Sequence, residues 1–386
     1  MQYKEETAMI YLDNAATSFP KPAGVSDRMK YYLDCIGAPV NRSVYGPAQE
    51  AAMTVLLLRE RLARLFSFPG DLSHVLLTAG ATAALNQIIC GYLHPGDHVL
   101  VSAMEHNAVM RPLLRLPGVT FDRIPCSREG VLDPAAIEPL IRPNTRLCVI
   151  AHGSNVCGTV QDAKTVGAVC AAHGIPFVLD AAQTAGHYPV DFQKFQLSAL
   201  AVPGHKGLLG PSGIGALLVR ADFAEKLTPL LAGGTGSASD SELLPDYLPD
   251  RFESGTQNLP GIFGWERALQ FIEETGVDAL RRHEKRLMAL FLRELEDVPG
   301  ICGVRDPTRC TGVLSVDFVG RDNAEAAELL EERYGILTRC GLHCAPSAHK
   351  TLGTFPGGTV RFSLGFASTE DDVLAAAAAI RELSQR

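Results

Sequence analysis

The stretch RCGLHCAPSAHKTLGT (339–354) brings together two cysteines, two histidines, an arginine and a lysine. These residue types can form a metal site, a disulfide or a nucleophilic thiolate. Near Cys340 and Cys344 there is no second cysteine pair at finger-like spacing, which disfavours a metal site. The choice between the other chemistries depends on what the rest of the chain supplies.

A second reactive candidate is Lys206, in the glycine-rich stretch PGHKGLLGPSGIG. A lysine there has no aliphatic surface to cover, and partial burial would lower its pKa as a Schiff-base lysine requires. Asp180 closes the apolar run IPFVLD, where an unpaired carboxylate would be costly to bury. A protonated pyridine nitrogen would satisfy it, so the pair points to pyridoxal 5'-phosphate (PLP). Read singly, the two are a loop lysine and a helix cap.

The elements that must position these residues follow an alternating pattern of β-branched runs and helical periods, which predicts a parallel α/β layer. Strands are expected at 74–78, 97–106, 145–155, 175–183, 198–206 and 213–219, and helices at 81–93 and 161–173. Ligands of such sheets bind beyond the carboxyl ends of the strands. Polar residues gather at those ends, namely Thr78, His106, Asn155, Asp180, Gln183, His205 and Lys206. This recurrence predicts a site there.

A second unit is expected after residues 232–258, which lose periodicity and become rich in Gly, Ser, Asp and Pro. Helices are predicted at 262–274, 277–296 and 323–334, strands at 311–319 and 361–364, and a last helix capped by Thr369. We therefore predict a large PLP-binding domain (1–262) and a small α+β domain (263–386) that carries the Cys344 loop. The N-terminal segment, about 1–25, is expected to pack with the small domain.

Bulk composition narrows the class of protein. Of 386 residues, 46% are hydrophobic and 20% charged, which is ordinary for a globular chain. The net charge of −8 and the lack of a basic run argue against nucleic-acid binding. The N-terminus is too polar for a signal peptide, and apolar stretches fall far short of the roughly 20 residues of a membrane helix. We expect a soluble, cytoplasmic protein without a membrane partner, with its ten cysteines mostly reduced.

Eight segments, in order over nearly the whole chain, resemble the class V aminotransferase-like, fold-type I PLP enzymes, and within them the cysteine desulfurases. They are YLDNAATSFPKP (11–22), EHNAVM (105–110), SNVCGT (154–159), DAAQTAGHYPVD (180–191), GHKGLLGPSGIGAL (204–217), ESGTQNLPGI (253–262), RCGLHCAP (339–346) and VRFSLGFAST (360–369). The HCA around Cys344 resembles the SufS-type branch. The resemblance implies an α/β fold, with a mostly parallel seven-stranded sheet between helices and a smaller α+β C-terminal domain.

The resemblance also implies roles around the cofactor. Lys206 would hold PLP, Asp180 would pair with the ring nitrogen, and Gln183 would hydrogen-bond the phenolic oxygen. His106 would stack on the ring and take part in catalysis. Asn155 would lie near the phenolic oxygen and the substrate carboxylate.

The phosphate site has a physical basis of its own. Gly80 and Ala81 precede a predicted helix, whose backbone N–H groups and dipole favour an anion, and Thr82 adds a hydroxyl. His205 resembles the family's phosphate-contacting histidine. Thr256 resembles the residue that reaches the phosphate from the neighbouring subunit, which implies a homodimer.

Several positions depart from the family pattern. Pro203 stands where the family often has Ser, so one hydroxyl contact to phosphate is expected to be missing. Ala81 and Ala83 replace the Thr and Glu of a GTTE stretch. Asn41 stands where the SufS-like branch often has His, and Ser368 ends a stretch usually written YNT. The Lys, Asp, Gln and Cys of the expected site are all present.

The chemistry implied by the resemblance is removal of sulfur from L-cysteine. Arg361 would clamp the α-carboxylate, for which a planar guanidinium fork is suited. The Cys344 thiolate would take the sulfur as a persulfide and release alanine, and a sulfur-acceptor protein would follow. Positive groups lower a thiol pKa, and the local candidates are Arg339, His343, His349 and Lys350.

Three alternatives remain at this point. Selenocysteine lyase would use nearly the same site, and another class V reaction, aminotransfer or β-elimination, would not need Cys344. A PLP-binding scaffold without its own chemistry is disfavoured by the intact Lys206, Asp180, Gln183 and His106. The role of Cys340 is open between packing and a thiol that traps a persulfide as a disulfide.

Overall fold

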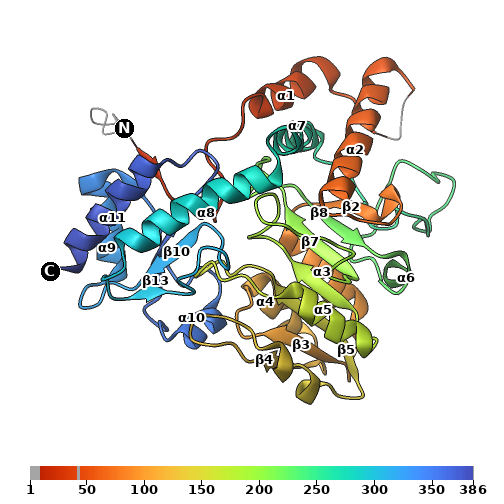
Figure 1. The fold of residues 1–386 in the computed structure, drawn as a ribbon. Helices are drawn as coiled ribbons and strands as arrows, with labels where there is room; N and C mark the ends of the chain where they lie inside the picture. Colours follow the sequence, from red (N-terminus) through yellow and green to blue (C-terminus); the bar gives the residue numbers. More distant parts are fainter. Residues whose placement is uncertain (1–8, 41–43, 386) are drawn as a thin grey trace.

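The computed structural model describes residues 9–40 and 44–385 (Figure 1), so Asn41 lies outside the described residues. Its largest sheet has seven strands in the order β2-β8-β7-β6-β5-β3-β4. Their bounds are Val75–Thr78 (β2), Gly215–Val219 (β8), Ala199–Pro203 (β7), Phe177–Asp180 (β6), Thr145–Ala151 (β5), His98–Ser102 (β3) and Thr120–Ile124 (β4). Only β8 runs antiparallel, to β2 and β7. The predicted mostly parallel seven-stranded sheet is confirmed.

Helices cover both faces of this sheet, which is why its strands read as continuous apolar runs. On one face α3 (Ala81–Tyr92) and α4 (Asn107–Arg115) pack against side chains such as Val99 and Val101. On the other face α2 (Gly46–Leu65), α5 (Ala163–Ala172) and α7 (Leu259–Thr275) pack against Leu100 and its neighbours. Successive residues of β3 thus enter different cores, as the period of two in a strand requires.

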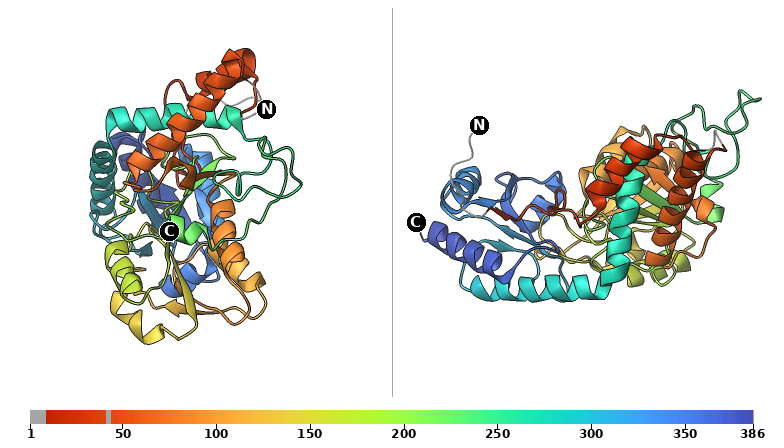
Figure 2. Two further views of the ribbon diagram at one scale, coloured as in Figure 1. Left: turned by 90° about the vertical axis from the view of Figure 1, so that its right-hand side faces the viewer. Right: turned by 90° about the horizontal axis from the view of Figure 1, so that it is seen from above.

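A second sheet is antiparallel, in the order β12-β13-β10-β9. Its strands are Arg339–Gly341 (β12), Thr359–Ser363 (β13), Val313–Val316 (β10) and Ile301–Cys302 (β9). It packs with α8 (Val277–Glu294), α9 (Asn323–Tyr334) and α11 (Glu370–Ser384) around its own hydrophobic core. Seen from above, these blue C-terminal elements lie at one end of the molecule and the large sheet at the other (Figure 2).

The N-terminal segment joins the two ends of the molecule. β1 (Ile10–Tyr11) pairs in parallel with β11 (Ile336–Leu337) beside the second sheet. A few residues later the Ala15 N–H donates to Ser363 Oγ at 2.8 Å, and the Ser18 N–H donates to the His205 carbonyl at 2.9 Å. The chain then enters α1 (Val25–Tyr31), which packs on α7. The segment therefore contacts β13 and the turn after β7 within four residues.

Some expectations need adjustment. The strand expected at 97–106 ends at Ser102, because His106 already caps α4. The sequence analysis did not anticipate α2, α4, β4 or the short helices α6 (Ala221–Ala224) and α10 (Pro346–Leu352). The Thr369 cap is confirmed, as a capping box with Asp372. The predicted boundary at 262/263 falls inside α7, and the two-domain division stays a prediction. Within the described ranges no helix is long and apolar enough to cross a membrane.

Candidate active site

A cavity of about 420 Å³ lies at the carboxyl ends of β5, β6 and β7, beside the start of α3. Eight of the predicted site residues line it: Ala81, Thr82, His106, Asn155, Asp180, Gln183, His205 and Lys206. Pro203, the departure from the family Ser, lines it as well. The strand ends thus bring these side chains together, whereas Thr256, Arg361 and Cys344 are not part of its lining. The cofactor and substrate roles of all of them stay predictions.

Lys206 and Asp180 are the charged groups of this cavity. Burial lowers the pKa of the Lys206 ammonium to about 8, against the opposing effect of the Asp180 carboxylate. Burial also raises the pKa of Asp180, although its Oδ1 accepts a hydrogen bond from the Ala182 N–H at 2.9 Å. A lysine with a pKa near 8 has an appreciable neutral fraction at physiological pH, and the neutral amine is the nucleophilic form.

His106 presents an uncharged ring to the cavity. It is the N-cap of α4, and its Nδ1 accepts a hydrogen bond from the Ala108 N–H at 3.0 Å, which leaves the ring proton on Nε2. Burial lowers the pKa of His106 to about 4, and the nearby Lys206 and Arg339 act in the same direction. The helix cap therefore fixes both the place and the tautomer of a flat, neutral ring.

The end of the cavity near α3 suits an anion. Ala81 and Thr82 form the first turn of α3, where backbone N–H groups point outward. Gly215 allows this turn to lie close to β8, because a Cβ there would be 2.6 Å from the Gly80 Cα. The buried Nδ1 of His205 has no hydrogen-bond partner among the described residues. Burial lowers the pKa of His205 to about 4, so the ring is neutral and can donate to an anion.

Thr256 is exposed and does not line this cavity, although it lines a neighbouring one that shares Asn86 and Gly213 with it. The segment that carries it is anchored by Glu253, whose two carboxylate oxygens accept hydrogen bonds from Arg59 at 2.9 and 2.7 Å. The Leu77 N–H also donates to Glu253, at 2.6 Å. These bonds hold the segment against α2 and β2, and Thr256 is exposed.

Arg361 is 2% exposed in β13 and is already paired. Its Nη2 donates to Asp13 Oδ1 at 2.6 Å and its Nη1 donates to the Asn155 carbonyl at 3.1 Å, whereas its Nε has no partner among the described residues. Asp13 was not among the predicted site residues, although it lies in the stretch 11–22 that resembles the family. A substrate carboxylate would have to share or replace this internal pairing.

Cys344 is exposed and follows β12. Two hydrogen bonds tie its loop to the neighbours of the cavity: Asn155 Nδ2 donates to the His343 carbonyl at 2.6 Å, and the Asn107 N–H donates to the Cys344 carbonyl at 2.8 Å. Because Asn155 lines the cavity and Asn107 follows His106, the loop lies at the cavity's edge. All ten cysteines belong to the described part and all are free thiols, so no disulfide joins Cys340 and Cys344.

The charges around Cys344 differ from those expected. Burial lowers the pKa of His343 to about 3 and that of His349 to about 4, so both rings are neutral near pH 7. The expectation that these two histidines supply positive charge is therefore wrong. Of the four candidates, Arg339 and Lys350 remain, and the Lys350 ammonium lies 5.0 Å from the Phe355 ring centroid. Among the described residues, no group of three or more His, Cys, Asp or Glu side chains could hold a metal ion.

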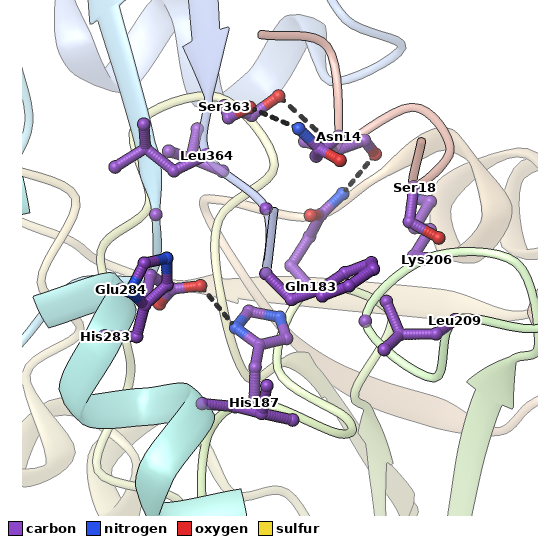
Figure 3. Close-up of a pocket in the computed structure, with 17 residues that line it drawn as sticks. Asn14, Ser18, Gln183, His187, Lys206, Leu209, His283, Glu284, Ser363 and Leu364 are labelled. Atoms are coloured by element: carbon purple, nitrogen blue, oxygen red, sulfur yellow. Dashed lines mark hydrogen bonds and ion pairs between the residues drawn. The ribbon is translucent and has the colours of Figure 1, made fainter. Parts of the chain in front are cut away.

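A smaller cavity of about 50 Å³ shares Lys206 and Gln183 with the first and reaches towards α8 (Figure 3). There His187 Nδ1 lies 2.6 Å from Glu284 Oε2. The His187 ring lies against Gly207, where a Cβ would come within 2.2 Å of His187 Cδ2. The backbone after Lys206 is thus supported from α8. The sequence analysis missed both partners of this pair, although His187 lies within the quoted stretch 180–191.

The fold and the site together define a class. A mostly parallel sheet with a lysine and a buried aspartate at or just beyond its strand ends has the architecture of the fold-type I PLP-dependent enzymes. The family described as aminotransferase class-V matches residues 10–375, and the chain belongs to this family.

Individual relatives are more specific. The chain is 33% identical to a probable cysteine desulfurase of Methanothermobacter thermautotrophicus, over 94% of this chain and 92% of the relative. It is 30% identical to the cysteine desulfurase CsdA of Escherichia coli, over 95% and 92% of the two chains. Among solved structures, an apo cysteine desulfurase from Thermococcus onnurineus superposes with a TM-score of 0.91 at 31% identity, and 98% and 95% of the chains are covered.

Proposed function

We propose that this chain is a PLP-dependent cysteine desulfurase that converts L-cysteine to L-alanine and transfers the sulfur to Cys344 as a persulfide. The observation that carries the proposal is the exposed Cys344, which Asn155 and Asn107 tie to the edge of the cavity that contains Lys206 and Asp180. The names of the relatives support the same activity. They do not favour the lyase or aminotransferase alternatives.

The donors and acceptors of the cavity fit PLP. Lys206 would hold it covalently, the Asp180 carboxylate would pair with the ring nitrogen, and the neutral His106 would stack on the ring. Gln183 would donate to the phenolic oxygen. When bound, PLP supplies an electron sink that makes the Cα proton of an amino acid removable.

The phosphate would lie at the start of α3, where backbone N–H groups and Thr82 donate. The unpartnered Nδ1 of His205 is the strongest support, because a buried imidazole nitrogen without a partner is costly. Ala81 contributes only its backbone and Pro203 contributes no hydroxyl, so we expect fewer phosphate contacts than in relatives with Thr and Ser there.

Lys206 and Cys344 would perform the chain's part of the reaction. The Lys206 amine, with its pKa lowered to about 8, suits the transfer of a proton at Cα. The Cys344 thiolate attacks the substrate sulfur, so that the carbon–sulfur bond breaks and a sulfur–sulfur bond forms. The carbon is reduced as the sulfur is oxidised, and a cysteine plus a thiol becomes an alanine plus a persulfide without a further oxidant.

Arg361 and Asn155 would bind the substrate carboxylate. The Arg361 Nε has no partner in the described part of the chain, and the guanidinium is held in place by Asp13 and the Asn155 carbonyl. We expect the incoming carboxylate to compete with Asp13 for the guanidinium. Selenocysteine, with the same carboxylate and amine, would bind in the same way.

The exposed Thr256 and Cys344 suggest how the protein assembles and which partner it needs. Thr256 is exposed and does not line the cavity of its own chain, which supports a homodimer in which it reaches the phosphate of the partner. The persulfide on an exposed cysteine requires an acceptor thiol, so we include a sulfur-acceptor protein. Iron–sulfur cluster assembly in the cytoplasm is the setting we propose.

The decisive experiment measures alanine and sulfide formed from L-cysteine by the wild type and by Cys344→Ala. We expect alanine formation to fall at least about a hundredfold in the variant, because its covalent nucleophile is lost. Cys340→Ser serves as the matched control. Equal rates in wild type and Cys344→Ala would refute the persulfide mechanism.

A further inference from the structure

A chain of hydrogen bonds starts at His343, the residue before Cys344. His343 Nε2 lies 3.2 Å from Thr359 Oγ1, Thr359 Oγ1 lies 3.1 Å from Ser315 Oγ, and Ser315 Oγ lies 2.5 Å from the Val156 carbonyl. All four residues are buried. This series of hydrogen bonds runs from the Cys344 loop across β13 and β10 to the segment just after Asn155.

The Val156 carbonyl, at the end of this series, determines which group donates in each of the hydrogen bonds. A carbonyl oxygen only accepts, so the Ser315 hydroxyl donates to Val156. Its single proton is then used, so the Thr359 hydroxyl must donate to Ser315. Thr359 in turn has only a lone pair left for His343, whose Nε2 must carry the proton. Burial lowers the pKa of His343 to about 3, which agrees with a neutral ring in this tautomer.

The backbone of this loop needs such support. His343 and Cys344 have φ values of +47° and +59°, in the left-handed region that non-glycine residues seldom adopt. Such a conformation persists only when its surroundings determine it. The carbonyls of His343 and Cys344 are held by Asn155 and Asn107, and the His343 ring is held by Thr359. His343 is thus fixed at both ends, and the Cys344 sulfur follows from the next residue.

We propose that Thr359 and Ser315 are positioning residues for the Cys344 sulfur. They act through the His343 ring, which keeps the left-handed turn and so aims the thiol at the cavity. The proposal rests on the proposed function only in that Cys344 is the nucleophile. Its physical content, a loop conformation held by two buried hydroxyls, can be measured separately.

The same region contains a matched control. His349 Nδ1 lies 2.7 Å from Thr354 Oγ1, and the His349 and His343 ring centroids are 5.6 Å apart. The Thr354 N–H also donates to the His349 carbonyl, at 2.9 Å, so this pair closes only its own turn after α10. Thr354→Val removes another buried hydroxyl that is not a member of the hydrogen-bond series from His343 to Val156.

The test uses Thr359→Val, Ser315→Ala, the conservative Thr359→Ser and the control Thr354→Val, all as holoenzymes. One readout is kcat and KM for alanine formation. The other is amide hydrogen exchange in the peptide 342–346, where the Ala345 N–H donates to the Leu342 carbonyl at 2.8 Å. The second readout does not depend on turnover.

For Thr359→Val we expect kcat to fall about tenfold or more, since a small displacement of a reacting group is enough for this. KM should stay within about twofold, because substrate contacts are unchanged. Exchange in 342–346 should rise about tenfold as the loop opens locally. Ser315→Ala should follow in the same direction, and Thr359→Ser and Thr354→Val should resemble the wild type.

Wild-type exchange and kcat in both Thr359→Val and Ser315→Ala would overturn the proposal. An equal rise in exchange in Thr354→Val would also overturn it, since the effect would then be general loosening. If Thr359→Val does not fold, Ser315→Ala decides alone. If the wild type forms no alanine but exchange still rises in Thr359→Val and not in Thr354→Val, the proposed function fails and the positioning role stands.

Discussion

Lys206 follows a strand of the large parallel sheet, whereas Cys344 follows an edge strand of the small antiparallel sheet. The side chains that line the cavity around Lys206 come from the ends of adjacent strands. The residues within these strands are buried. The loop around Cys344 is a left-handed turn held by side chains from elsewhere. In the proposed function, the cofactor would thus bind in a rigid part of the molecule, and sulfur would be captured in a part whose geometry depends on a few hydrogen bonds.

The largest effect should come from the rigid part. In the proposed function Lys206→Ala removes both the attachment point and the proton carrier, so alanine formation should fall by roughly 10²–10⁴-fold or more. The measurement is alanine release together with absorbance of the bound cofactor. Lys194→Ala, at an exposed lysine paired with Asp191, is the control. Retention of even a tenth of wild-type activity in Lys206→Ala would assign the chemistry to another group.

The second prediction tests the rigidity of the large-sheet region through its stability. Glu253→Gln leaves the buried Arg59 without its counter-ion, so the free energy of unfolding should fall by about 3–5 kcal/mol. Glu370→Gln, in the exposed pair with Arg286, should cost less than about 1 kcal/mol. Denaturant titration of both variants makes the comparison. Similar losses in the two variants would mean that the buried pair is no more important than a surface one.

The third prediction compares the two regions under acid. Burial holds the pKa of His152 at about 4 and that of His343 at about 3, below the ordinary value of 6.5. The unfolded chain then binds protons that the folded chain does not. The stability that each provides is complete above pH 6.5 and is lost as the pH falls towards the folded pKa, by up to about 1.4 kcal/mol per pH unit.

The measurement is the free energy of unfolding between pH 7 and pH 5 for wild type, His152→Gln and His343→Gln. Each substitution should reduce the pH slope by about the contribution of one histidine. If His343→Gln has the same pH slope of the unfolding free energy as the wild type, while His152→Gln has a smaller slope, the His343 ring becomes protonated within the folded protein. The Cys344 loop would then open before the large sheet.

The smallest effect is expected at the other cysteine of the opening cluster. Cys340 lies half-buried in β12, and burial raises the pKa of its thiol, which makes it less reactive. Cys340→Ser should leave alanine formation unchanged and alter stability by about 1 kcal/mol at most. Turnover before and after peroxide treatment is the measurement. If the variant resists oxidation better than wild type, Cys340 traps the persulfide and does not merely pack.

The sequence predicted the cavity well because its residues are local features. Each one lies at or within four residues after the end of a strand, or at the start of a helix, and parallel strands place their carboxyl ends together. The pairs that hold the Cys344 loop and Arg361 were not predictable in this way. Arg361 and Asp13 are 348 positions apart, and Thr359 and Ser315 are 44 apart, so no spacing rule relates them.

Other omissions had a readable signal. In α2 the buried Val55, Leu58 and Leu62 follow helical spacing, so this helix was open to prediction. In α4 an internal proline, Pro112, obscured the pattern, because proline ordinarily argues against a helix interior. The neutral state of His343 had no signal at all, since it results from burial between segments distant in the chain.

The N-terminal segment has a consequence for the order of folding. Ile10 and Tyr11 pair with residues 336 and 337, and Asn14 Nδ2 donates to the Ser363 carbonyl at 3.0 Å. The first described part of the chain to be synthesised therefore acquires its partners among the last. On the ribosome the large sheet can form early, but the segment that joins it to β13 must wait until β13 has emerged. A nascent chain would thus complete the cavity around Lys206 well before it could bring Cys344 to the edge of that cavity.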